Sequence, residues 1–139
     1  MFLSETTVAL PRCNSDKIGL KSVFSKYVVA ERNGHANANR DKLDMWEQFF
    51  VEKKGNNKFA FKSHHGKYLI ALPNGKVMAN GPRPDTWETF TVEAMGLKTA
   101  FKTHHNTYLF ADRAGNLNAK RKLGHGSGFS INCLGGLNG

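Results

Sequence analysis

The most constraining feature of the sequence is a unit of about 40 residues that occurs three times. Three tyrosines mark its register, since Tyr27, Tyr68 and Tyr108 are 41 and 40 residues apart. The copies read "KIGLKSVFSKYVVAERNGHANANRDKLDMWEQFFVE" from Lys17, "KFAFKSHHGKYLIALPNGKVMANGPRPDTWETFTVE" from Lys58 and "KTAFKTHHNTYLFADRAGNLNAKRKLGHGSGFSIN" from Lys98. A lysine, an alanine and a glycine also coincide: Lys21, Lys62 and Lys102; Ala30, Ala71 and Ala111; Gly34, Gly75 and Gly115. Each copy is therefore one structural unit that stacks on its neighbours.

Within each copy, apolar and polar residues alternate with a period of two, which is typical of β-strands. In the second copy, Phe59 and Phe61 alternate with Lys58, Ala60 and Lys62. The turn-forming sequences "HHGK", "LPNGK" and "NGPRPDT" separate the runs. Four short strands per copy predict twelve strands, and no helical period of useful length competes with them.

Three four-stranded units predict an all-β fold, a β-trefoil, in which one hairpin per unit enters a six-stranded barrel and the other enters a cap. A four-bladed propeller uses repeats of similar length, but three blades do not close comfortably. Burying one large apolar side chain contributes about 1.5–3 kcal/mol, so about a dozen can specify the fold. The expected inward positions are Leu20, Phe61 and Phe101; Val28, Leu69 and Leu109; Ala36, Val77 and Leu117; Phe49, Phe90 and Phe129; Val51, Val92 and Ile131.

The ends of the chain lie outside the repeats. We expect an N-terminal segment over residues 1–16, a single domain over 17–133 and a flexible tail over 134–139. The first ten residues make a poor signal peptide, and no stretch approaches the roughly 18 apolar residues of a membrane helix. Cys13 and Cys133 form no metal-type cluster, and we expect unpaired thiols of a cytosolic protein. A bridge between them is the alternative if the termini lie together.

The charge of the chain favours an anionic partner. Lysine and arginine outnumber aspartate and glutamate by 20 to 11, which gives a formal charge of +9. The fold alone does not require this excess, so an acidic protein surface, a sulfated glycan, an anionic lipid or a nucleic acid is indicated. The basic residues are concentrated in "KKGNNK" (53–58) and "KRK" (120–122). Exposed aromatic residues do not interleave with them, which makes nucleic acid the weakest candidate.

Two histidine pairs, His64–His65 and His104–His105, lie at expected hairpin turns in "FKSHHGKYLIA" and "FKTHHNTYLFA". Adjacent residues of an extended chain point to opposite sides, which is poor geometry for one metal ion, and zinc needs three or four convergent ligands. The interpretations are, in order, a structural or surface turn, a recognition surface that gains charge on mild acidification, and a metal site. The first copy has "LKSVFSKYVVA" there, so the fold does not require the pair.

The segments "FKSHHGKYLIA", "NGKVMAN" and "DTWETFTVE" resemble the repeat signature of the fascin-like β-trefoil family, over about residues 17–133. The histidine pairs are similar to those of its hisactophilin-like single trefoils. The resemblance implies a cytoplasmic, non-enzymatic protein that binds, and in some members bundles, actin filaments (F-actin). It also implies that the loop "NANRDKLDMW" (37–46) contacts actin through Arg40 and Lys42; the serine that the family phosphorylates there is missing.

Combining the resemblance with the charge, we predict actin binding by exposed basic residues. The candidates are Arg40, Lys42, Lys53, Lys54, His64, His65, Lys67, His104, His105, Lys120, Arg121 and Lys122. The alternative is a glycan- or heparin-type trefoil, although the lectin signature Gln-x-Trp is absent and Trp46 and Trp87 are expected to pack beside the last strand of their repeats. No nucleophile–base pair, paired carboxylates or cofactor loop occurs. We therefore predict no catalytic residues, no cofactor and no metal.

Overall fold

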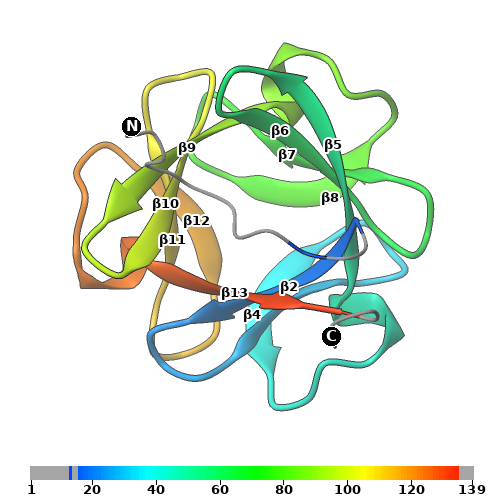
Figure 1. Cartoon of the computed structure of the whole chain (residues 1–139), viewed down its shortest axis with the longest axis horizontal. Coiled ribbons are helices and arrows are strands. Elements are labelled where there is room, and N and C mark those ends of the chain that lie inside the picture. Colours follow the sequence, from blue (N-terminus) through cyan, green and yellow to red (C-terminus); the bar gives the residue numbers. More distant parts are fainter. Residues whose placement is uncertain (1–12, 14–15, 135–139) are drawn as a thin grey trace.

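A computed structural model of the chain describes Cys13 and residues 16–134, which form twelve β-strands in three sets of four (Figure 1). The first repeat contains β2 (Lys17–Ser22), β3 (Tyr27–Ala30), β4 (Ala36–Arg40) and β5 (Phe49–Gly55). The second contains β6 (Lys58–Lys62), β7 (Tyr68–Ala71), β8 (Val77–Gly81) and β9 (Phe90–Met95). The third contains β10 (Lys98–Lys102), β11 (Tyr108–Ala111), β12 (Leu117–Lys120) and β13 (Phe129–Cys133). One 3-10 turn precedes the last strand of each repeat: η1 (Met45–Glu47), η2 (Thr86–Glu88) and η3 (His125–Ser127).

The first and last strands of the three repeats close a barrel. Six antiparallel pairings run around it: β2 with β5, β5 with β6, β6 with β9, β9 with β10, β10 with β13, and β13 with β2. The last pairing joins the two ends of the domain, so the barrel leaves no free edge. The predicted all-β β-trefoil of twelve strands is confirmed.

The second and third strands of each repeat form the cap. The three hairpins are β3–β4, β7–β8 and β11–β12. Their turns carry Gly34, Gly75 and Gly115, each at a φ near +93°, a conformation that favours glycine. Each of these glycines accepts a backbone hydrogen bond from an alanine of a neighbouring hairpin: Ala79 N to Gly34 O (2.8 Å), Ala119 N to Gly75 O (2.8 Å) and Ala38 N to Gly115 O (2.9 Å). The ring joins the three hairpins, and the positive φ at its acceptor residues explains why glycine recurs in every copy.

The core lies inside the barrel and under the cap. All the predicted inward positions are buried except Val51 and Ile131, which are half-buried and pack against the core. Val51 lines a surface groove between the first two repeats, which accounts for its exposure. Five fully buried phenylalanines form the centre, with ring centroids 5.5–5.9 Å apart where they contact one another: Phe49, Phe61, Phe90, Phe101 and Phe129.

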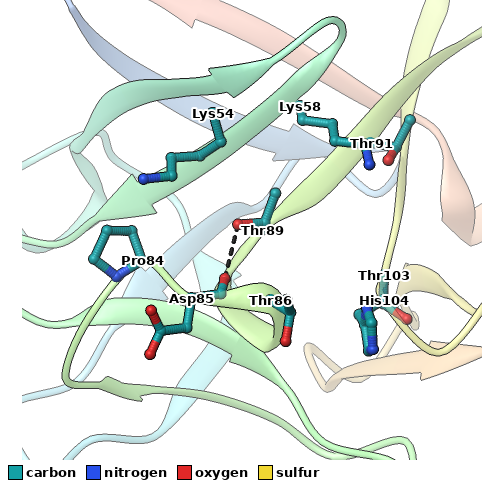
Figure 2. A pocket seen from close by; sticks show the side chains of 9 residues that line it. All are labelled: Lys54, Lys58, Pro84, Asp85, Thr86, Thr89, Thr91, Thr103 and His104. Carbon is teal, nitrogen blue, oxygen red and sulfur yellow. Dashed lines mark hydrogen bonds between the residues drawn. The ribbon is translucent and has the colours of Figure 1, made fainter.

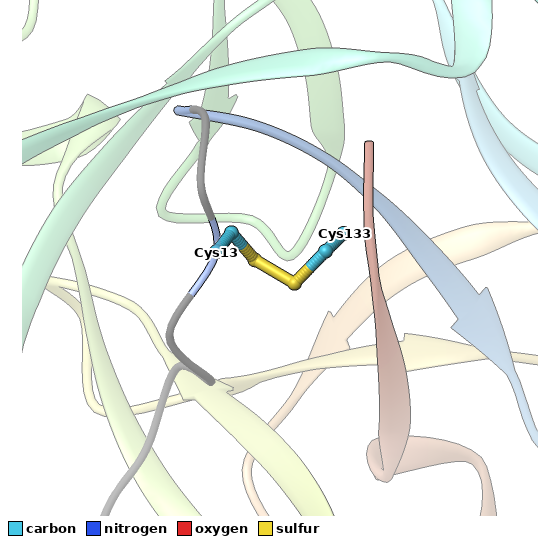
Figure 3. The surroundings of a disulfide bond; sticks show 2 residues. All are labelled: Cys13 and Cys133. Atoms are coloured by element: carbon cyan, nitrogen blue, oxygen red, sulfur yellow. A yellow bond between two sulfur atoms is a disulfide. The ribbon is translucent and has the colours of Figure 1, made fainter. Parts of the chain in front are cut away.

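The prediction of unpaired thiols is wrong, because Cys13 and Cys133 form a disulfide (Figure 3). Their Cα atoms are 5.5 Å apart, a normal separation for a bridge. The cause is the barrel closure: β13 runs antiparallel to β2 and places Cys133 opposite Ile18. The end of β13 therefore lies beside the start of β2, close to Cys13.

The expected tail over 134–139 and the expected N-terminal segment over 1–16 fall almost entirely outside the described residues. Only Cys13, Asp16 and Leu134 of these segments are described. In the part of the chain that the structure describes, no helix is long and apolar enough to span a membrane.

Candidate functional site

The second histidine of each pair joins two repeats. The turn holds it in place, because Ser63 Oγ accepts a hydrogen bond from the backbone N–H of His65 (3.1 Å). The His65 ring then reaches the first repeat, where Nε2 donates to the carbonyl oxygen of Ala30 (3.0 Å). Its edge also packs against Trp46, with ring centroids 4.8 Å apart. This side chain is a structural link between repeats.

The next junction repeats the same arrangement one unit further along. His105 Nε2 donates to the Ala71 carbonyl oxygen (3.0 Å), and its ring lies 5.2 Å from Trp87. The two tryptophans therefore pack on a histidine of the following repeat in addition to preceding the last strand of their own. The histidine partner was not predicted from the sequence, and packing of the tryptophans against the last strand stays a prediction.

At the third junction, Phe24 stands where the other copies have His65 and His105. Its ring packs edge-on against His125 (5.7 Å), and the Arg113 guanidinium lies over its face (5.0 Å). Gly126 replaces the tryptophan here, and a Cβ atom at this position would collide with the carbonyl oxygen of Ala111. The glycine-rich segment "GHGSG" is thus a close-packed junction.

The first histidine of each pair, His64 and His104, is exposed. The two rings of each pair are neighbours, with centroids 5.6 Å and 5.4 Å apart. Among the described residues there is no group of three or more histidine, cysteine, aspartate or glutamate side chains that could hold a metal ion. The outer histidines are surface groups beside the basic residues.

The recurring tyrosines and lysines are also structural. Tyr68 donates its hydroxyl proton to Glu52 Oε2 (2.7 Å), and burial, reinforced by Glu52, raises the pKa of Tyr68 to about 12. The ammonium group of Lys62 lies over the same ring, 6.0 Å from its centroid. Tyr108 and Glu93 repeat the hydroxyl–carboxylate bond (3.1 Å).

Arg40 is engaged by the carboxylates of its own repeat. Its guanidinium lies 2.7 Å from Glu31 Oε1 and 3.8 Å from Glu47 Oε2, and only 36% of the side chain is exposed. Burial raises the pKa of Glu47, and the nearby Arg40 charge opposes this. The neighbouring Lys42 is exposed, while Asp41 pairs with Lys26. The predicted actin-contact loop therefore presents one unpaired cation, Lys42.

The other basic candidates lie on three separate exposed loops. Lys53 and Lys54 belong to the β5–β6 hairpin, and Lys67 belongs to the β6–β7 turn. The third group, Lys120, Arg121 and Lys122, spans the end of β12 and the loop to η3. Within residues 16–134 none of these side chains forms an ion pair, because the salt bridges found there use Lys26, Arg40 and Arg83.

The structure brings two of the predicted residues together in a groove of about 610 Å³ that lies mostly between the second and third repeats and is also lined by Lys54 of the first. Lys54 lies on one side and His104 on the other, and Figure 2 shows Lys58 and the η2 turn beside them. The groove is lined by Lys54, Lys58, Pro84, Asp85, Thr86, Thr89, Thr91, Thr103 and His104. Lys58 and the threonines were not predicted as site residues, because their proximity depends on how two repeats pack.

The closed barrel, the cap and the three junctions define a single β-trefoil with basic loops. The sequence matches the fascin family, described as Fascin domain, over residues 23–123. This match covers most of the chain, which therefore belongs to the fascin family. No curated protein sequence matches the chain significantly. The fascin family is a structural, non-enzymatic fold family, in agreement with the family resemblance of the repeats.

Proposed function

We propose that this protein binds actin filaments through exposed basic loops on a rigid trefoil, and that it has no catalytic activity. Its membership of the fascin family carries the proposal. The formal charge of +9 supports it, because an actin filament presents a strongly acidic surface.

Two loops supply the principal contacts in this proposal. The β12–η3 loop presents Lys120, Arg121 and Lys122, and the β5–β6 hairpin presents Lys53 and Lys54, all exposed and without ion-pair partners in the described chain. The ammonium group of Lys120 also lies over the Phe110 ring, 4.1 Å from its centroid, so Arg121 and Lys122 are the more available cations of their loop. Because these cations have no ion pair to break within their own protein, they are available to pair with filament carboxylates.

The other predicted contact residues fall into two groups, those that are exposed and those that are bonded to partners within the domain. Lys42, Lys67, His64 and His104 are exposed and can contribute charge to the surface. Arg40, His65 and His105 are held by partners within the domain, and we assign them to supporting the loops.

Binding by loop charges should weaken with salt, because surface charges further apart than about 8 Å are screened at physiological ionic strength. The test is co-sedimentation with filaments across a salt series. We expect pelleting at low salt that falls steeply as salt rises. Protein that stays in the supernatant at low salt overturns the proposal, and a heparin column run in parallel tests the glycan alternative.

The loop assignment needs a charge-matched control. The triple change Lys120→Glu, Arg121→Glu and Lys122→Glu should reduce pelleting. The single change Arg121→Glu should reduce pelleting more than Lys76→Glu on the cap hairpin, which alters the charge by the same amount. Thermal unfolding of these variants verifies that the fold is intact. Equal pelleting of the triple variant and the unmodified protein would place the actin contact elsewhere.

We also propose a cytoplasmic, cytoskeletal location, and the disulfide makes this testable. Disulfides persist mainly in oxidising compartments, so a cytoplasmic protein must bind filaments with Cys13 and Cys133 reduced. Co-sedimentation with and without reductant compares the two forms. Loss of binding on reduction argues against a cytoplasmic role.

A further inference from the structure

The groove between the second and third repeats contains a lysine that differs from its equivalents in the other repeats. Lys17, Lys58 and Lys98 each begin the first strand of a repeat. The Lys17 ammonium lies over the Phe50 ring (5.4 Å to the centroid), and Lys98 Nζ donates to Ser130 Oγ (3.1 Å).

Lys58 has neither kind of partner. The residue equivalent to Phe50 and Ser130 is Thr91, and Lys58 and Thr91 lie together at one end of the groove (Figure 2). Within residues 16–134, the ammonium group of Lys58 forms no ion pair and no hydrogen bond within the protein. One of three equivalent lysines is thus left available to a ligand.

The groove also has a row of hydroxyl groups. Thr89 Oγ1 donates to the Asp85 carbonyl oxygen (2.8 Å), and Thr103 Oγ1 is bonded to Thr107 Oγ1 (2.6 Å). The hydroxyls of Thr86 and Thr91 have no partner in the described protein. Lys54 and Lys58 on one wall and His104 on the other therefore frame two available hydroxyls.

The carboxylate of Asp85 determines which ligands fit. Asp85 lies at the Pro84 end of the groove, with Arg83 as a loose partner at 3.7 Å. The Asp85 carboxylate can accept hydrogen bonds from hydroxyl groups and disfavours an anion placed directly against it. The Lys58 end offers an unpaired cation to a phosphate or sulfate group.

We propose that this groove binds a sugar or polyol that carries phosphate or sulfate groups, with an ester group at Lys58 and hydroxyls toward Asp85. The groove between the first and second repeats serves as an internal comparison. It also has two basic residues, Lys62 and His64, but the carboxylates of Asp16 and Glu52 line it with them, and its single hydroxyl, that of Ser63, already accepts a hydrogen bond from His65 N. The proposal goes beyond actin binding, because most of the groove lies apart from the loops assigned to the filament.

Titration of the full chain with inositol hexakisphosphate and, separately, with a sulfated oligosaccharide tests the proposal by calorimetry and backbone amide NMR. We expect saturable binding to at least one probe, with shift changes at Lys58, Thr86 and Thr91. Saturation by the first probe assigns a phosphorylated polyol, and saturation by the second assigns a sulfated glycan. No saturable binding to either overturns the proposal.

Matched variants separate a built site from general charge attraction. Lys58→Gln should weaken binding by about tenfold or more, since a hydrogen bond to a charged group is lost. Lys76→Gln removes the same charge from the cap and should have little effect, while Asp85→Asn should tighten binding. Equal losses in the two lysine variants would show nonspecific attraction and overturn the site.

The outcome is distinguishable from that of the actin proposal. Thr91→Val removes a groove hydroxyl without changing charge, so it should weaken groove binding and leave filament pelleting nearly unchanged, and the triple variant at residues 120–122 should keep its groove affinity. Groove binding without pelleting would reject the actin proposal alone, and the reverse result would reject the groove alone.

Discussion

Where the second repeat meets the first, His65 packs against Trp46 and donates to the Ala30 carbonyl; where the first meets the third, Phe24 takes the place of that histidine. The junctions also differ in covalent structure. The β5–β6 hairpin carries the chain directly from the first repeat to the second. No hairpin carries the chain from the third repeat to the first, which meet through the pairing of β13 with β2, the Phe24–His125 contact and the hydrogen bond from Ala38 N to Gly115 O.

The disulfide compensates for this missing connection. Cys13 and Cys133 are 120 residues apart in sequence, and their bond ties the segment before β2 to the end of β13. The junctions between the first and second repeats and between the second and third each use a hairpin and a histidine. The junction between the third and first repeats uses the Phe24–His125 contact and the disulfide. A fold with threefold symmetry can therefore be closed by different residues at its three junctions, provided that a hairpin or a covalent bond holds each one.

The largest expected effect comes from opening the bridge. Replacing Cys13 and Cys133 with serine should lower the free energy of unfolding by about 5 kcal/mol, the chain-entropy value for a loop of this length. Urea unfolding with and without reductant measures it. The double variant serves as the control, because reductant should not change its midpoint. Equal midpoints for oxidised and reduced protein would contradict the role of the bridge.

The next effect concerns Gly126, at the junction between the third and first repeats. Gly126→Ala should destabilise the fold by about 1–3 kcal/mol, because the new methyl group meets the Ala111 carbonyl and the Phe110 ring. Gly55→Ala is the control, since its Cβ has ordinary contacts with Lys58 at 3.8 Å. Denaturant midpoints compare the two variants, and a neutral Gly126→Ala would mean that this junction is loosely packed.

A smaller effect is expected when the first junction is made to resemble the third. His65→Phe keeps an aromatic ring beside Trp46 but leaves the Ala30 carbonyl without its side-chain donor. The loss should be about 1 kcal/mol, the usual net contribution of such a hydrogen bond. The exposed neighbour provides the control: His64→Phe should change the melting temperature little. If both variants melt alike, the carbonyl bond does not stabilise the junction.

The sequence predicted the fold well because the repeated residues act locally or through burial. Phe61 and Leu69 fill the core, and Gly75 adopts a turn conformation that other residues avoid. Each of these requirements recurs with the repeat, so the pattern of three copies reveals it. The prediction for Val51 and Ile131 was less accurate, because their exposure depends on the surface where repeats meet.

The site was less predictable because its contacts cross between repeats. His65 bonds a carbonyl 35 residues earlier, and the pairing of Cys13 with Cys133 follows from which strands close the barrel. The expectation of free thiols rested on the reducing conditions of the cytosol and used no geometry. One signal was nevertheless available in the sequence. The first copy has Phe24 in place of the histidine, and the third copy has Gly126 in place of the tryptophan that contacts this histidine in the other copies.

The smallest expected effect is a difference between the repeats in how stability depends on pH. Glu88 in η2 and Glu47 in η1 are buried carboxyls, whereas the third repeat has Ser127, which does not titrate. Burial is the main cause that raises the pKa of Glu88 above its ordinary 4.5; Asp85 adds to the shift, and backbone amides oppose it. The folded chain therefore binds this proton more tightly than the unfolded chain.

The sign of the pH dependence follows from that difference. The stabilisation linked to Glu88 is fully present below pH 4.5 and is lost as the pH rises through the higher folded pKa. Glu88→Gln should reduce this loss and stabilise the protein slightly at neutral pH, by less than the changes above. Unfolding free energies at several pH values from 4 to 7 measure the slope, with Ser127→Ala as a non-titrating comparison. An unchanged slope in Glu88→Gln would show that this carboxyl does not distinguish the second repeat from the third.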